Sequence, residues 1–120
     1  MATSRSPQQG DVYWIDPNPT SGREMKNRHH FVVITAEAIN SLGTSMTVPI
    51  TTAGAFAQRM GLTVPVSGRN TIGVAVCNQV RSFDLQTRVQ MGGARYVESL
   101  DQEIVSEIIS RVLSVIEPAE

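Results

Sequence analysis

The sequence predicts a mainly β domain with one C-terminal helix, arranged as a small barrel or curled sheet. Short runs of β-branched and aromatic residues, separated by Gly, Pro, Asn or Asp, recur through residues 10–80 and are typical of short antiparallel strands. Residues 100–117 instead repeat apolar side chains every three or four positions, as an amphipathic helix does. A chain of 120 residues can build one hydrophobic core. We therefore expect one domain at residues 10–118, after a disordered lead-in at residues 1–9.

The expected strands follow one another with short turns between them, at residues 10–16, 31–35, 44–50, 62–66 and 71–80. The run at residues 31–35 is continuously apolar but too short for a helix, which indicates a central strand. Pro49 indicates that its end of the third strand lies at a sheet edge or a bulge. A helical turn is expected at residues 36–42, and residues 86–96 have no clear pattern.

The C-terminal helix has the clearest start and stop signals. Ser99 and Gln102 have the spacing of a capping box, and Pro118 ends the pattern. Apolar side chains from Ile104 to Ile116 share one face, while Glu107 and Arg111 lie on the other. This helix is expected to pack one side against the sheet.

Composition excludes several classes of protein. No apolar run approaches the roughly 18 residues of a membrane span, so no membrane association is expected. Cys77 is the only cysteine, which argues against a disulfide framework and favours a reducing cytoplasm, with the thiol as a buried apolar group. The sequence has no Cys/His pattern for zinc and no acidic cluster for calcium or magnesium. No metal or cofactor is therefore expected.

Charge is divided unevenly along the chain. Residues 20–95 hold eight basic and three acidic side chains, whereas residues 96–120 hold one basic and six acidic side chains. A basic body is consistent with a polyanionic partner. A mixed solvated surface is the alternative, because the pI near 6.1 is low for a protein that binds duplex nucleic acid.

Polar residues concentrate in three segments that are expected to meet at one end of the sheet: residues 23–30, 51–59 and 78–84. Their guanidinium groups can grip phosphate, and their imidazoles can move protons near neutral pH. Their hydroxyls and amides can read unpaired bases. The residues concerned are Arg23, Arg28, His29, His30, Thr51, Thr52, Asn78, Gln79 and Arg81.

Such a set suits RNA cleavage in which the neighbouring 2′-hydroxyl attacks phosphorus without a metal. Each member also has a simpler interpretation. The histidines can be surface residues, the threonines turn residues, and Arg81 a partner for Asp84. Trp14 and Phe56 can stack on bases, although Trp14 is expected in the core.

Five motifs in order resemble the MazF/PemK family of toxin endoribonucleases: GDVYW at residues 10–14, DP and PTSGRE within 16–24, VPITT at 48–52, GAFA at 54–57 and VCNQVRSFD at 76–84. The resemblance covers about residues 10–116. It implies a PemK-like, SH3-related small β-barrel that forms a homodimer. It also implies a toxin that cuts single-stranded mRNA at short sequences, and an antitoxin partner whose flexible tail occupies the RNA groove. The toxin–antitoxin complex would bind operator DNA through the antitoxin.

The resemblance also implies roles for particular residues. The family arginine that acts on the scissile phosphate corresponds to Arg28 or, by direct counting, to His29; we favour Arg28, with His29 or His30 assisting proton transfer. Thr51 matches the catalytic threonine, and Glu24 matches a glutamate near the site that is a candidate base.

One branch of the family assigns an acid and an arginine where this sequence has Asn78 and Val76, neither of which can transfer a proton. Asn78 would then orient the ribose or a base, and Arg23 would hold phosphate. The remaining contacts to RNA are expected from His30, Thr52, Phe56, Arg59, Gln79 and Arg81.

Two other functions remain open at this point. The gyrase poison CcdB has a related fold without nuclease activity, and a toxin of that kind would act through its C-terminal helix and dimer face. An SH3-like adaptor is the third interpretation. The His, Arg and Glu side chains at residues 23–30 argue against both.

Overall fold

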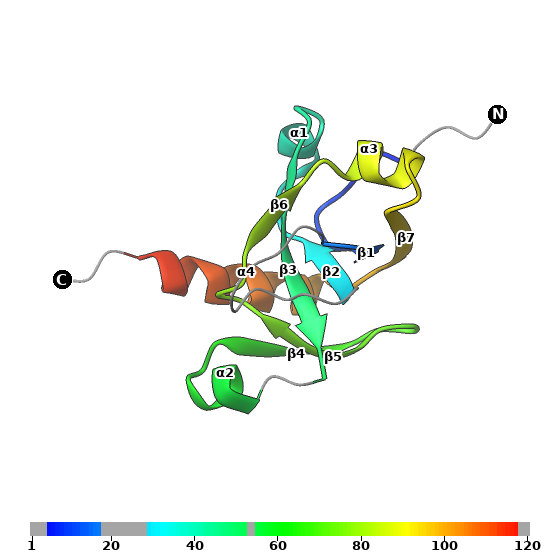
Figure 1. Ribbon diagram of the computed structural model, residues 1–120. Helices are drawn as coiled ribbons and strands as arrows, with labels where there is room; N and C mark the ends of the chain where they lie inside the picture. Colours follow the sequence, from blue (N-terminus) through cyan, green and yellow to red (C-terminus); the bar gives the residue numbers. More distant parts are fainter. Residues whose placement is uncertain (1–4, 18–28, 53–54, 118–120) are drawn as a thin grey trace.

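The computed structural model describes residues 5–17, 29–52 and 55–117, and these residues confirm the expected fold class (Figure 1). One antiparallel sheet has the strand order β4-β5-β3-β2-β1-β7, and β6 also pairs with β3. The strands are β1 (Asp11–Ile15), β2 (His29–Val33), β3 (Ser45–Thr51), β4 (Thr63–Ser67), β5 (Ile72–Val76), β6 (Arg81–Phe83) and β7 (Ala94–Ser99). The helices are α1 (Glu37–Asn40), α2 (Ala55–Arg59), α3 (Leu85–Gln90) and α4 (Gln102–Ile116).

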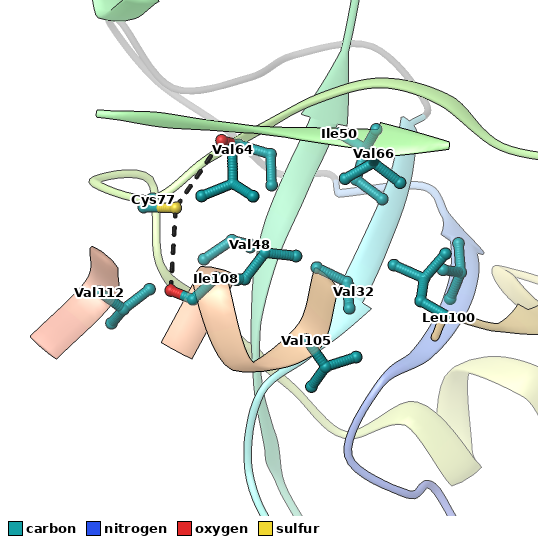
Figure 2. Close-up of a cluster of buried hydrophobic side chains, with 12 residues drawn as sticks. Val32, Val48, Ile50, Val64, Val66, Cys77, Leu100, Val105, Ile108 and Val112 are labelled. Atoms are coloured by element: carbon teal, nitrogen blue, oxygen red, sulfur yellow. Dashed lines mark hydrogen bonds between the residues drawn. The ribbon is translucent and has the colours of Figure 1, made fainter. Parts of the chain in front are cut away.

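Side chains alternate between the two faces of a strand. In the central strands, apolar side chains on both faces are buried. On one face, apolar residues of β1 to β5 pack against α4 through Val105, Ile108 and Val112 (Figure 2). On the other face, Phe31 belongs to a second cluster formed with Tyr13, Ile15, Val33, Phe83, Leu85 and Ala94. Burial on two sides explains why Phe31–Val33 of β2 and Ile34 after it form a continuous apolar run rather than an alternating one.

Cys77 lies in the first cluster, as expected. Its thiol is fully buried and points toward the backbone oxygens of Ala75 and Ile108, at 3.7 and 4.0 Å (Figure 2). Burial raises the pKa of this thiol to about 11. At neutral pH the thiol is therefore protonated and behaves as a small apolar group.

The sheet curls until its two ends come together. The carboxylate of Glu98 in β7 accepts hydrogen bonds from the backbone N–H groups of Arg69 (2.9 Å) and Asn70 (2.8 Å), at the tip of the β4–β5 hairpin. A side chain at position 68 would collide with this carboxylate, since an added Cβ would lie 2.6 Å from its Oε1 atom. Gly68 therefore permits the contact that brings the hairpin onto β7.

The part of the expected lead-in that the structure describes packs on the domain. Arg5 forms an ion pair with the buried carboxylate of Asp11, at 3.0 Å. The carbonyl oxygen of Pro7 accepts a hydrogen bond from the side-chain amide of Asn40, at 2.9 Å. Residues 5–9 thus differ from the loose segment expected from composition.

Two expectations about the strands were wrong. Pro49 is in a central strand, where it pairs with Phe31 of β2. On its other side β3 changes partner, from β6 at residues 45–47 to β5 at residues 50 and 51, so Pro49 interrupts neither ladder. The long strand expected at residues 71–80 is also divided, because β5 ends at Val76 and a turn at Cys77 and Asn78 leads to β6.

The expected capping box of α4 is also absent. Ser99 is the last residue of β7, and its hydroxyl donates to Asp11 at 2.8 Å. The N-cap is Asp101, without a side-chain capping bond. Ser99 therefore makes a tertiary hydrogen bond to Asp11 instead of the capping bond that its spacing from Gln102 predicted.

No helix among residues 5–17, 29–52 and 55–117 has the length and apolar character needed to cross a membrane.

Candidate functional site

Two residues predicted for the site meet where β2 begins and β3 ends. Ile15, the last residue of β1, pairs with His29, and His30 pairs with Ile50 of β3. Thr51 comes directly after Ile50, so it lies beside His29 at the same end of the sheet. Thr51 is buried, whereas Thr52 is exposed. The structure therefore brings an imidazole next to a threonine at the point where three strands end or begin.

His29 is on the same face of the sheet as Phe31, and an aromatic row continues from it. The His29 and Phe31 rings meet edge to face at a centroid distance of 6.4 Å. Phe31 meets Phe83 of β6 in the same way at 5.2 Å. The guanidinium carbon atoms of Arg81 and Arg88 lie 5.1 and 4.7 Å from the centre of the Phe83 ring. Two cations and one imidazole thus border a single aromatic surface.

The two histidines are partly buried strand residues, and this burial affects their titration. Burial lowers the pKa of His29, and the neighbouring charge of His30 lowers it further. Burial also lowers the pKa of His30, as does the positive charge of Arg95, while Glu98 acts in the opposite direction. Both imidazoles are therefore neutral at pH 7 and able to accept a proton.

The third predicted segment shares this face but not this end of the sheet. Val74 pairs with Thr51, and Asn78 comes four residues later, in the turn that follows the end of β5 at Val76. Arg81 pairs with Thr47, and its carbonyl oxygen accepts a hydrogen bond from the Thr47 hydroxyl at 2.8 Å. Arg81 thus borders the site along β3 rather than at its centre, and Asn78 and Gln79 lie in the connection between β5 and β6.

Four predicted residues have no described side chain: Arg23, Glu24, Arg28 and Phe56. Arg23, Glu24 and Arg28 lie outside the residues that the structure describes. Phe56 belongs to α2, but its side chain is not among those described. Arg59 ends the same helix and is exposed.

Arg88 is a functional candidate that sequence reasoning missed. Its Nη1 atom donates to the carbonyl oxygen of Asp16 at 2.7 Å, and the Asp16 N–H donates to the carbonyl oxygen of Gly93 at 2.9 Å. Both backbone groups of Asp16 are therefore held by α3 and the turn after it. Residues 17–28, which carry the predicted catalytic arginine, begin directly after this anchor. The weakly patterned sequence around Arg88 contained no signal of this contact.

In the described part of the chain, no three His, Cys, Asp or Glu side chains are grouped so that they could hold a metal ion.

The fold is that of MazF. The crystal structure of MazF (Form-I) from Deinococcus radiodurans matches with a TM-score of 0.78 and 21% sequence identity, over 94% of this chain and 98% of that one. The MazE–MazF structure (Form-II) from the same organism matches with a TM-score of 0.73 and 21% identity, over 94% and 97% of the two chains.

Sequence comparison identifies the family. Residues 8–116 match the family described as PemK-like, MazF-like toxin of type II toxin-antitoxin system. The chain is also 32% identical over 113 residues to the endoribonuclease toxin ChpB of Escherichia coli (strain K12), over 92% of this chain and 94% of ChpB. The chain therefore belongs to the PemK-like, MazF-like toxins, which confirms the resemblance seen in its motifs.

Proposed function

We propose that this chain, an endoribonuclease toxin of a type II toxin–antitoxin system, cleaves single-stranded RNA without a metal. The 2′-hydroxyl loses its proton and its oxygen forms a bond to the adjacent phosphorus. The bond from phosphorus to the 5′-oxygen breaks, and that oxygen takes up a proton. The products are a 2′,3′-cyclic phosphate and a 5′-hydroxyl. The step needs a proton acceptor, a proton donor and positive charge on the phosphate oxygens.

The observation that carries this proposal is a neutral imidazole beside a threonine where three strands end or begin. His29 would accept the 2′-hydroxyl proton, and Thr51 would contact the phosphate. Arg28 would neutralise the phosphate oxygens, with Glu24 as the alternative base. Asn78 would orient the ribose or a base. Contacts that hold the RNA would come from Arg23, His30, Thr52, Phe56, Arg59, Gln79 and Arg81.

One assay separates this activity from the gyrase-binding alternative, which family membership does not favour. Purified protein is mixed with a pool of single-stranded RNA in excess EDTA. Cleavage that leaves cyclic phosphate ends supports the proposal. Intact RNA together with stalled gyrase would support the alternative.

The pH dependence of cleavage tests the role of His29. A base must be unprotonated to act, so kcat/KM should fall as the pH drops through the pKa of His29, which lies below the ordinary value near 6.5. A His29→Gln variant should lose this acidic limb and about 10²-fold or more in rate, the typical contribution of a general base. The measurement is kcat/KM from pH 4.5 to 8. An unchanged acidic limb in the variant would assign the base elsewhere, with Glu24 next.

Arg88 should act as a positioning residue. Arg88→Met keeps much of the side-chain volume but removes the hydrogen bond to Asp16, so kcat should fall by roughly 10- to 100-fold, as small misplacements of catalytic groups do. Arg88→Lys, which can still donate to the carbonyl oxygen, should recover part of the loss. Single-turnover cleavage and a thermal melt are measured together. Equal kcat in Arg88→Met and the wild type would remove this role.

The proposed partners follow from the same family. The Form-II complex from D. radiodurans pairs MazF with MazE. We therefore propose a cognate antitoxin for this chain, homodimer formation, and binding of the complex to operator DNA through the antitoxin. The proposed substrate is mRNA, which places the toxin's action in the cytoplasm.

A further inference from the structure

A second group of aromatic and cationic side chains crosses three adjacent strands. Trp14 of β1 pairs with His30 of β2 on one side and with Arg95 of β7 on the other. Directly paired residues in a sheet project from the same face. The three side chains therefore form a row across the sheet, which we call the Trp14 row.

The Trp14 row is on the surface rather than in the core, where Trp14 was expected. Val12, two residues earlier on the same face, is fully buried in the cluster with α4, but Trp14 is only partly buried. Arg95 is exposed, and its guanidinium carbon lies 5.6 Å from the centre of the Trp14 ring. An indole with a cation at this distance can be stacked upon by a base while the cation meets the phosphate.

The charge around the Trp14 row favours a negatively charged ligand such as RNA. Glu98 is the acidic group that acts on His30, and its carboxylate is engaged by the N–H groups of Arg69 and Asn70 at the hairpin tip. Its negative charge is thus partly satisfied within the protein, and Arg95 adds positive charge beside the indole. The local field is suited to a phosphate.

The row also adjoins the candidate active site. His30 belongs to the row, and His29, the proposed base, is the preceding residue on the opposite face of β2. Consecutive Cα atoms are about 3.8 Å apart. An RNA strand that passes around this end of the sheet would meet His29 and Thr51 on one face and Trp14 on the other.

We propose that Trp14, His30 and Arg95 form a stacking subsite for an unpaired base next to the cleaved nucleotide. This inference rests on the proposed function and assigns a part of the substrate to a particular surface. Trp14 supplies the stacking face, Arg95 contacts the adjacent phosphate, and His30 hydrogen-bonds the base or ribose.

Trp14 is the only tryptophan of the chain, so its fluorescence reports directly on the subsite. The probe is a single-stranded RNA octamer with 2′-O-methyl groups, which cannot form the attacking oxygen. Saturable quenching is expected, and an octamer lacking bases at its central positions should quench much less. Equal quenching by both octamers would overturn the proposal, because phosphate charge alone would then explain it.

Cleavage kinetics supply the second test. Trp14→Leu and Arg95→Ala should each raise KM about tenfold, the loss expected for one stacked base or one phosphate contact, with little change in kcat. Arg111→Ala is the matched control, since Arg111 is an exposed arginine on α4 that is not part of the row, and this variant should behave as the wild type. A thermal melt checks that each variant is folded. KM values equal to the wild type in Arg95→Ala would overturn the subsite.

The outcomes separate this inference from the proposed function. Wild-type cleavage in EDTA without quenching would remove the subsite and leave the nuclease. Quenching without any cleavage would keep the RNA-binding surface and remove the proposed activity. If a peptide of the antitoxin quenches Trp14 but the octamer does not, the surface is a protein-binding site and the inference is wrong.

Discussion

Arg28→Ala should lower the rate of RNA cleavage by at least about 10²-fold, because loss of one preorganised donor to the transition state has an effect of about that size. The phosphate gains negative charge as the 2′-oxygen attacks, and a guanidinium can meet two of its oxygens at once. Single-turnover cleavage of a defined single-stranded RNA in EDTA measures the effect. The thermal midpoint and the oligomeric state should stay as in the wild type.

Arg28→Lys is the informative control. Lysine keeps the charge but not the two-point fork, so it should recover part of the rate. Full activity in Arg28→Ala would remove this assignment and leave His29, the residue reached by direct counting, for the role of the family arginine.

Asp11→Ala should lower the free energy of unfolding by about 3 kcal/mol, the largest stability effect expected from a single polar side chain here. Asp11 is only 1% exposed. Its carboxylate accepts from Arg5 Nε (3.1 Å) and Nη2 (3.0 Å), from the Gln8 N–H (3.0 Å) and from the Ser99 hydroxyl (2.8 Å). Alanine would leave these donors without their acceptor and would release residues 5–9 from β1 and β7.

Urea denaturation of the two proteins measures this difference. Asp101→Ala is the matched control, because Asp101 is an exposed carboxylate at the start of α4 without a capping bond. Its expected effect is within about 0.5 kcal/mol. If Asp11→Ala is no less stable than this control, the network around Asp11 does not hold the N-terminal segment.

Strands and the final helix were predictable because their signals are local. The apolar run before Thr35 and the three- and four-residue spacing after Leu100 each appear within a few neighbouring residues, and the structure has β2 and α4 there. The helix α3 and the strand β7 were missed, because their side chains are mostly exposed or partly buried and follow no clear apolar period. Asn78 was a missed turn signal, since asparagine is common in turns and β5 ends just before it.

The candidate site was predictable in its chemistry but less so in its geometry. His29 and Thr51 are adjacent, as expected of residues at loop ends, but Arg81 lies farther along β3 and Asn78 is in the turn after β5. That difference arises because β3 pairs with β6 at residues 45–47 and with β5 at residues 50 and 51. Such pairing joins segments distant in the sequence, so local patterns do not predict it. Arg88 is 72 residues from its partner Asp16, so no local pattern connects the two.

From residue order alone came the mainly β class, the C-terminal helix and the chemical groups available for RNA cleavage, because periodicity, turn residues and side-chain types are properties of neighbouring positions. The packing of the chain decided which of those groups face one another. It placed His29 beside Thr51, aligned Trp14 with His30 and Arg95, and buried Asp11 under Arg5. These contacts depend on strand register and on segments distant in the sequence, whose association is governed by the burial of both faces of the sheet.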